Sequence, residues 1–375
     1  GFANFGCAAG SDRPGAAGMP YAFWIKTCQG MPAAAAADEI FIEVLGVAQD
    51  AGLPQANCYR PHCMRAWDDP ELRRRATSIA VIDRAHGKKY LFDATPDIRE
   101  QLFDLHRSAP DGDYVLEGVF LTHAHIGHYT GLMHFGREAA GTDRVPVYAM
   151  PRMKEFLSSN GPWDQLVRLQ NIELIGLTDA KAVRLGPNLR VTPFIVPHRD
   201  EYSETVGFRI DGPNRSAVFI PDIDKWAMWE TDIRDIVRGV DYALLDATFF
   251  KDGGLGGRDM SKIKHPFVSE TMDLLDALSD EEKARVIFIH MNHTNPLLVE
   301  GQVQGGVAPG ANLWAVRVFG NSGSTSEAAV VCGLDWVLST HESASLPDID
   351  VVNMSIGYNW IDANIDSDTD AAAQE

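Results

Sequence analysis

The chain contains a series of short apolar segments that each end in a histidine or an aspartate. Residues 115–121 lead into a histidine-rich stretch, and later apolar segments lead into His198, Asp222 and His290. Short runs of β-branched and apolar residues are typical of strands. Strands that each deliver a polar side chain at the same end predict a site at one edge of a sheet. Because helical spacing separates some of these strands, we expect an α/β layered domain.

The strongest motif is the stretch THAHIGH at residues 122–128, which directly follows an apolar strand. In an extended backbone His123 and His125 point to the same side, because side chains alternate along a strand. His128 returns after the turn, so that three imidazoles converge on one small volume. Zinc and iron take such ligands, and the stretch therefore predicts a metal site.

Composition and charge narrow the range of partners. The 375 residues include 33 basic and 52 acidic side chains, a formal net charge of −19. This charge argues against nucleic-acid binding, which relies on clustered lysine and arginine. No apolar run of about 18 residues occurs, so that no membrane span is expected. A small-molecule substrate is the expected partner, and the oligomeric state is open.

The sequence divides into three parts. Residues 1–38 are rich in glycine, alanine and proline and predict a disordered or leader-like extension. Residues 39–298 carry the strand and helix patterns, and residues 299–375 form an acidic tail with 11 acidic residues and one basic residue. The small residues before Asp38 suggest export to a periplasm, whereas the few cysteines fit the cytoplasm, so that both locations stay open.

The order of these polar residues resembles the metallo-β-lactamase superfamily. Within it, residues 45–58, 93–99 and 290–296 are similar to segments of the pyrroloquinoline quinone biosynthesis protein B branch. The resemblance covers about residues 39–298. It implies an αβ/βα four-layer sandwich with metals at the edge between two central sheets.

The resemblance implies two half-sites with six ligands: His123, His125 and His198 for one metal, and His128, His290 and a bridging Asp222 for another. Asp93 would orient a ligand histidine through a hydrogen bond. In one respect the chain departs from the superfamily, whose motif has aspartate where this chain has Gly127. We therefore expect one firmly bound Zn²⁺ and a second that is weak or absent, and the ligand types also accept iron.

This metal site predicts a metal-dependent hydrolase that activates water against a small-molecule ester, amide or phosphoester. Asp222 and His293 are the candidate catalytic residues, with His293 as proton donor or as a hydrogen-bonded structural histidine. Arg199 is a candidate for binding an anionic substrate, or forms a surface salt bridge. The alternatives are metal-dependent oxidation, a phosphodiesterase or nuclease of the same superfamily, and a non-catalytic metal-binding relative.

A second candidate metal site lies at Cys58, His62 and Cys63. The resembled branch often carries a denser cysteine knuckle that binds structural zinc, and here Arg60 stands where a further cysteine is expected. A closed structural zinc site needs four donors, and this segment offers three. Structural zinc and two free thiols are the alternatives.

The tail resembles a different family. Residues 306–318 and 350–357 are similar to segments of the subtilisin-like serine peptidases, and the likeness spans roughly 305–357. It implies a partial parallel α/β fragment without the catalytic histidine and serine motifs, so that we expect no peptidase activity. We interpret the tail as a fusion or an assembly artefact, with a junction near 298–304.

Overall fold

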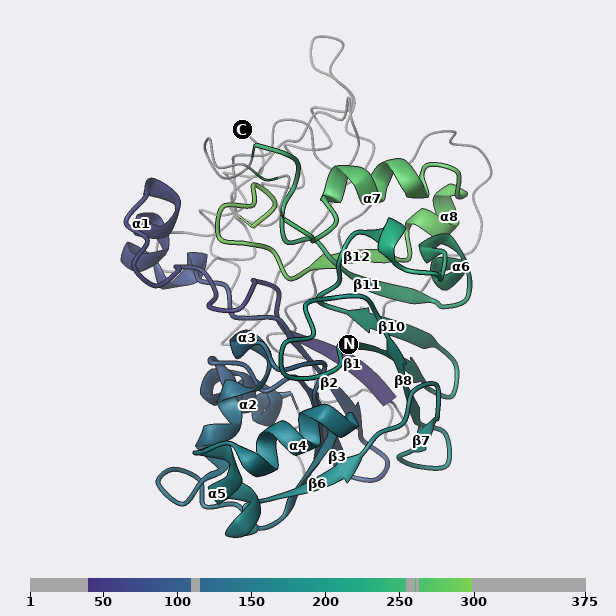
Figure 1. The fold of residues 1–375 in the computed structure, drawn as a ribbon. Helices are drawn as coiled ribbons and strands as arrows, with labels where there is room; N and C mark the ends of the chain where they lie inside the picture. Colours follow the sequence, from purple (N-terminus) through teal and green to yellow (C-terminus); the bar gives the residue numbers. More distant parts are fainter. Residues whose placement is uncertain (1–39, 109–114, 254–259, 261–262, 299–375) are drawn as a thin grey trace, which may run out of the picture.

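Two six-stranded sheets form the centre of the molecule (Figure 1). The computed structural model describes residues 40–108, 115–253, 260 and 263–298. The first sheet has the order β1 (Ile40–Gly46), β2 (Ser78–Asp83), β3 (Lys88–Phe92), β4 (Val115–Phe120), β5 (Val145–Ala149), β6 (Ile172–Gly176). The second has the order β12 (Val286–Ile289), β11 (Tyr242–Asp246), β10 (Ser216–Ile220), β9 (Val206–Asp211), β8 (Arg190–Ile195), β7 (Val183–Arg184).

Helices cover the outer face of each sheet. The first sheet is covered by α2 (Ile98–Arg107), α4 (Pro151–Ser159) and α5 (Trp163–Arg168). The second is covered by α6 (Ile233–Arg238) and α7 (Val268–Leu275), and α8 (Asp280–Lys283) packs against α6. Two further short helices, α1 (Pro61–Asp68) and α3 (Ile126–Tyr129), lie beside the sheets in Figure 1. The predicted four-layer αβ/βα sandwich is therefore confirmed.

Side-chain alternation along the strands separates the two apolar cores. In β2, Ile79 and Val81 face the second sheet, whereas Ala80 and Ile82 face the helices. Between the sheets, the Phe120 ring stacks on that of Phe92 at 4.9 Å and meets that of Phe208 edge-on at 5.6 Å. Such ring contacts add to the free energy gained by burying the apolar surface.

The strands that precede the predicted ligands all run in the same direction. Strands β3 to β6 are parallel to one another, as are β10 to β12. Strand β1 runs in the direction of β3, because β2 between them is antiparallel to both. Strand β8 runs in the direction of β10 for the same reason, with β9 between them. The carboxyl ends of these strands therefore meet at one edge of the sandwich. There the Met291 amide donates to the Val47 carbonyl at 2.8 Å, which links the ends of β12 and β1 across the two sheets.

The predicted extension at residues 1–38 and the tail at 299–375, including its subtilisin-like segment, lie outside the described residues. Their interpretation stays a prediction. Among the described helices, none has the length and apolarity needed to cross a bilayer.

Glu43 in β1 is an acidic side chain buried away from this edge. The Ser108 hydroxyl donates to one carboxylate oxygen at 2.6 Å, and the other oxygen has no hydrogen-bonding partner among the described residues. Burial raises the pKa of Glu43 from 4.5 to about 7. The folded state thus binds the carboxyl proton of Glu43 more tightly than the unfolded state. The resulting stabilisation of the folded state is lost as the pH rises from about 4.5 through 7.

We expect Glu43→Gln to stabilise the protein at pH 8 by up to about 3 kcal/mol and to leave its stability nearly unchanged at pH 5. Glutamine keeps the shape of the protonated acid but cannot ionise. The variant therefore does not lose folding stability when the pH rises above the folded-state pKa of Glu43. Urea unfolding of both proteins at the two pH values measures the difference. Equal stabilities at pH 8 would show that Glu43 titrates normally.

Candidate metal centre

Four predicted ligands meet at the shared strand edge, between the two sheets. His123 follows β4, His198 follows β8, and Asp222 follows β10. His125 Nδ1 lies 2.9 Å from His123 Nε2 and 3.2 Å from His198 Nε2. The Asp222 carboxylate lies 3.2 Å from each of these two Nε2 atoms. Four ligand atoms held at about 2.0–2.1 Å around a tetrahedral zinc would be roughly 3.3 Å apart, close to these distances.

A second group of polar atoms lies beside the first. One carboxylate oxygen of Asp50 and one ring nitrogen each of His128 and His290 lie within 4.8 Å of one another. Asp222 Oδ2 is 3.8 Å from His128 Nε2, so that its carboxylate stands between the two groups, as a bridging ligand would.

Buried atoms without partners show that these residues fit a metal. Among the described residues, Asp50 Oδ1, His128 Nε2, Asp222 Oδ1 and His290 Nε2 are buried and make no hydrogen bond. Each unsatisfied buried polar atom costs roughly 1–3 kcal/mol. Imidazole nitrogens and carboxylate oxygens are ligands of zinc and iron, and cations held in these neighbouring groups of donors would satisfy the four atoms.

Hydrogen bonds to the far side of each imidazole fix its orientation. The His128 ring donates through Nδ1 to Asp93 at 2.7 Å, and the His198 ring does so to Asp224 at 3.0 Å. His290 Nδ1 lies 2.9 Å from the Thr248 hydroxyl. These contacts leave the Nε2 atoms facing the centre. Asp93 therefore lies against His128, one of the predicted ligand histidines.

The protonation states of His123 and Asp222 suit a metal site. Burial, together with the neighbouring His128, lowers the pKa of His123 well below its usual range and keeps that ring neutral. Burial alone would favour the neutral acid at Asp222, but the surrounding His198, His265 and His290 hold its pKa well below its usual range. Neutral imidazole and ionised carboxylate are the forms that bind a metal. Burial alone would lower the pKa of His128, but Asp93 and Asp50 raise it to about 9, so that this ring must lose a proton when a metal binds.

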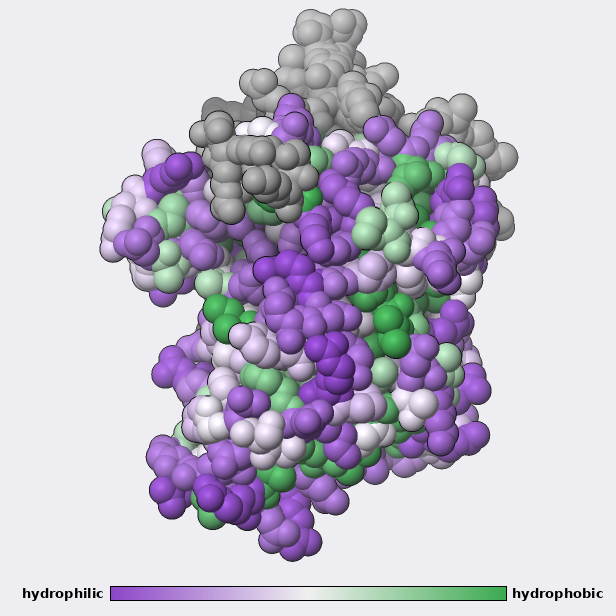
Figure 2. All heavy atoms as spheres, in the orientation of Figure 1, coloured by the Kyte–Doolittle hydropathy of each residue, from purple (hydrophilic) through white to green (hydrophobic). Residues whose placement is uncertain are grey.

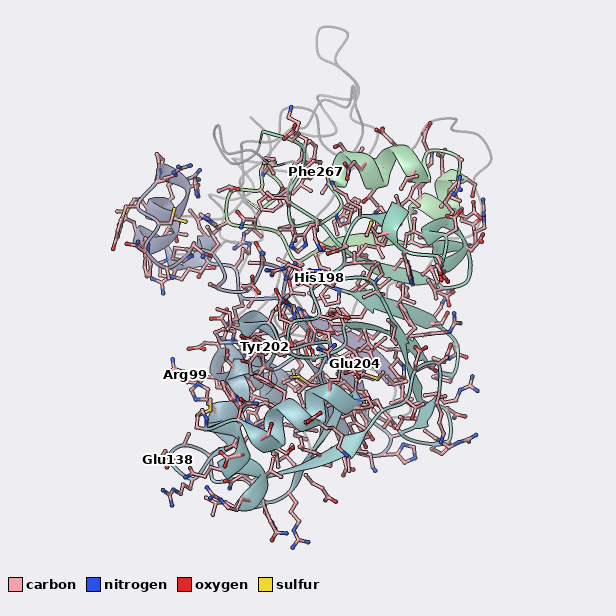
Figure 3. The ribbon with its side chains drawn as sticks, in the orientation of Figure 1. Arg99, Glu138, His198, Tyr202, Glu204 and Phe267 are labelled. Atoms are coloured by element: carbon pink, nitrogen blue, oxygen red, sulfur yellow. The ribbon has the colours of Figure 1, made fainter. Side chains whose placement is uncertain are left out.

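In the view of Figure 1, the site lies at the height of a polar part of the surface. Figure 2 shows hydrophilic residues gathered across the middle of one face, and Figure 3 shows His198 at the same level, between the upper and lower halves.

Residues 88–291, more than half of the chain, match the beta-lactamase superfamily domain. The chain belongs to the beta-lactamase superfamily. It is 30% identical over 283 residues to coenzyme PQQ synthesis protein B of Methylobacterium radiotolerans, a match that covers 69% of this chain and 92% of that protein. The protein of the same name from Methylobacterium nodulans is 31% identical over 282 residues, covering 68% and 91%.

A solved structure confirms the superfamily fold. Zn²⁺-bound PqqB from Methylobacterium extorquens superposes with a TM-score of 0.57 at 23% identity, over 69% of this chain and 92% of that one. The resemblance to the superfamily and to its quinone-cofactor branch is therefore confirmed for the domain that carries the site.

Two residues that lie beside the predicted ligands, Asp246 and His265, were not predicted from the sequence. Asp246 is the last residue of β11, and like the predicted ligands it comes at the end of an apolar strand. His265 precedes α7 in a segment without strand periodicity, so that no local pattern marked it. Its Nδ1 lies 2.8 Å from Asp246 and 3.2 Å from Asp222. Burial alone would lower the pKa of His265, but these two carboxylates raise it to about 9.

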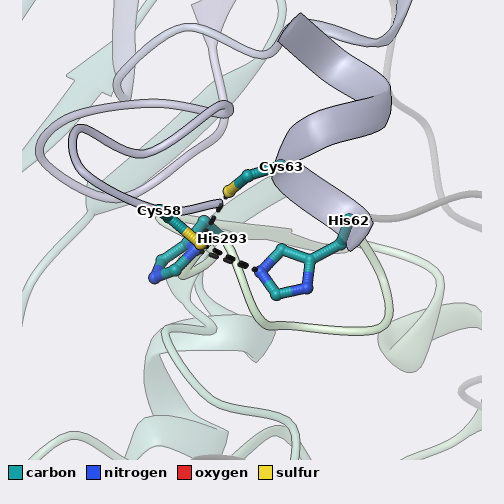
Figure 4. Close-up of side chains that lie close together, drawn as sticks. All are labelled: Cys58, His62, Cys63 and His293. Carbon is teal, nitrogen blue, oxygen red and sulfur yellow. Dashed lines mark hydrogen bonds between the residues drawn. The ribbon is translucent and has the colours of Figure 1, made fainter. Parts of the chain in front are cut away.

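His293 does not lie where the sequence placed it. Its Nδ1 is 3.3 Å from Cys63 Sγ and 3.3 Å from His62 Nε2, and Cys58 Sγ is 3.7 Å from His62 Nε2 (Figure 4). Assignment of His293 as proton donor rested on its closeness to His290 in sequence. The chain turns between the two residues, and the geometry places His293 in the cysteine cluster instead.

The cluster of Cys58, His62, Cys63 and His293 thus offers four donor atoms within 4.8 Å of one another. Burial raises the pKa of the Cys63 thiol to about 11, and burial lowers the pKa values of His62 and His293. The thiol is therefore protonated and the two imidazoles are neutral without a cation. The fourth donor missing from the sequence prediction comes from a segment 230 residues away.

Arg199 lies at the surface beside the site. Its guanidinium is 3.6 Å from the Glu201 carboxylate, and the His125 ring donates through Nε2 to Glu201 at 2.9 Å. The structure thus shows the surface salt bridge that was one of the two expectations for Arg199.

Proposed function

We propose that this chain is a metal-dependent hydrolase that cleaves a small-molecule ester, amide or phosphoester. The observation that carries the proposal is the convergence of His123, His125, His198 and Asp222 at distances that suit one tetrahedral ion. We propose Zn²⁺ as the resident metal. When bound, the metal supplies Lewis acidity and activates water.

The residues around the centre have distinct tasks in this proposal. Asp93 and Asp224 hold the rings of His128 and His198 in place. Asp222 carries negative charge between the two half-sites. His265, held by Asp246 and partly exposed at the centre, supplies the proton that the leaving group takes up. This role replaces the one predicted for His293.

A second candidate function is a metal-dependent oxidation in the making of a quinone cofactor. The names of the curated relatives favour it, since both are coenzyme PQQ synthesis proteins. The donor set also accepts iron. A phosphodiesterase acting on nucleic acid is disfavoured by the net charge of −19.

Reloading the metal-free chain separates these candidates. The stripped protein is reloaded with Zn²⁺ or Fe²⁺ and assayed on p-nitrophenyl acetate, an aryl amide and bis-p-nitrophenyl phosphate. Zinc-dependent turnover of the ester or amide supports the proposal, and turnover of the phosphate diester alone favours a phosphodiesterase. Oxygen uptake only by the iron form supports oxidation, and no reaction by any form supports a non-catalytic metal-binding protein.

We further propose that Cys58, His62, Cys63 and His293 hold a structural zinc, which needs four donors. We expect Cys63→Ser and His293→Ala each to lower the zinc content by about one equivalent and to lower the melting temperature. The exposed neighbour change Tyr59→Phe is the control and leaves both unchanged. Metal analysis with thermal unfolding measures the effect. Unaltered zinc in His293→Ala, with a loss of turnover, would return His293 to a catalytic role.

A further inference from the structure

We propose that Asp50 is a metal ligand that completes the second half-site, in place of the aspartate missing at Gly127. The proposal rests on the metal-dependent function proposed above. It goes beyond it by assigning a ligand that neither the superfamily motif nor the strand-end pattern identifies.

The link between the two sheets places Asp50 at the centre. Immediately before it, the Gln49 amide donates to the Met291 carbonyl at 2.8 Å, and the Asn292 side chain donates to Gln49 Oε1 at 2.7 Å. Immediately after it, the Gly52 amide donates to the Gln49 carbonyl at 2.9 Å and closes a turn. Asp50 is therefore held on both sides, one residue from the segment that pairs with the end of β12.

The side chain of Asp50 points into a group of atoms that need a partner. Its Oδ1 is 3.7 Å from His128 Nε2. Asp50 Oδ1, His128 Nε2 and His290 Nε2 are all buried without a hydrogen bond among the described residues, and the two histidine side chains are 1% and 0% exposed. One carboxylate oxygen and two imidazole nitrogens, with Asp222 beside them, form a complete donor set for a divalent cation.

The turn that carries Asp50 also explains why residue 127 is a glycine. A Cβ built on Gly127 would collide with the Oδ1, Cα and Cβ of Asp50. No side chain fits at position 127 while the turn occupies this place. The carboxylate of the second half-site is therefore moved to another loop rather than lost.

The backbone at Asp50 is unusual for a residue with a side chain. Its φ is +33°, in the left-handed region that most residues avoid. Glycine would adopt this conformation at lower cost. Strained positions of this kind cluster at ligand-binding sites, and an aspartate held there agrees with a ligand role.

With Asp50 as a ligand, the number of tightly bound zinc ions that we expect differs from the number expected from the sequence. With Asp50, His128, His290 and Asp222, the second half-site has as many protein donors as the first. We therefore expect two zinc ions of comparable affinity at the histidine centre, instead of one firm and one weak.

Zinc binding to the full chain tests this ligand assignment. Metal-free protein is dialysed against stepped concentrations of free Zn²⁺, and zinc per chain is counted by mass spectrometry. The variants are Asp50→Asn, which keeps the shape, and Asp50→Gly, which suits the positive φ. Asp143→Asn, at an exposed position, is the charge-matched control. Cys63→Ser identifies the zinc that belongs to the cysteine cluster.

We expect one of the two zinc ions at the histidine centre to bind at least about tenfold more weakly in both Asp50 variants. The control keeps wild-type binding. Two zinc ions with unchanged affinity in both variants, or a single zinc at the wild-type centre, would overturn the assignment of Asp50. A wild-type centre that binds no zinc at all would instead overturn the proposed function, so that the two failures are distinguishable.

Discussion

His125→Ala is expected to empty the first half-site and to lower turnover by roughly 10³-fold or more, because a bound metal contributes several kcal/mol to such a reaction. His125 Nδ1 lies within 3.2 Å of the donor atoms of both His123 and His198. Its side chain is 17% exposed, so that the substitution leaves only a small cavity in the fold. The lost function is therefore separable from unfolding.

Zinc content, circular dichroism and turnover are compared for the wild type, His125→Ala and His106→Ala. His106 is an exposed histidine on α2, remote from the metal ligands in sequence, and serves as the matched control. The control keeps wild-type zinc and turnover. Wild-type zinc content in His125→Ala would contradict the ligand assignment at the first half-site.

His265→Gln is expected to lower kcat by roughly 10²–10³-fold without loss of zinc, since a positioned proton donor contributes about this much. Glutamine keeps a donor near Asp246 but cannot deliver a proton. The effect depends on the leaving group. A p-nitrophenolate leaves without protonation, so that its ester is affected little, whereas an alkyl ester shows the full loss.

Steady-state kinetics with the two esters, together with metal analysis, measures this difference. The pH profile of the wild type also loses activity on the alkaline side as the donor deprotonates, and the variant lacks this decline. An equal loss with both leaving groups would mean that His265 acts by holding Asp246 and Asp222 in place.

The ligands that follow strands were predictable from the sequence. Apolar runs mark β4, β8, β10 and β12, and parallel strands end at a common edge, so that His123, His198, Asp222 and His290 had to lie near one another. The alternation of side chains likewise put His123 and His125 on one side. Local periodicity and the direction of strands are sufficient for this part of the site.

Other residues depend on contacts that no local pattern shows. Asp50 reaches the centre only because the end of β1 pairs with Met291, far along the chain. The contact between His293 and Cys63 was not predictable, because sequence distance from His290 does not show the turn that carries His293 there. Strand β5 was not predicted, and Pro146 within it weakens the strand pattern there.

Zinc-edge anomalous diffraction from crystals of the zinc-loaded full chain tests whether His123, His125, His198 and Asp222 hold a zinc ion. We expect a peak about 2.0–2.1 Å from the nitrogens of His123, His125 and His198, next to the Asp222 carboxylate. A peak among Cys58, His62, Cys63 and His293 serves as the internal control that zinc was present. A peak at the cysteine cluster with none at the three histidines would show that His123, His125 and His198 do not hold a zinc ion.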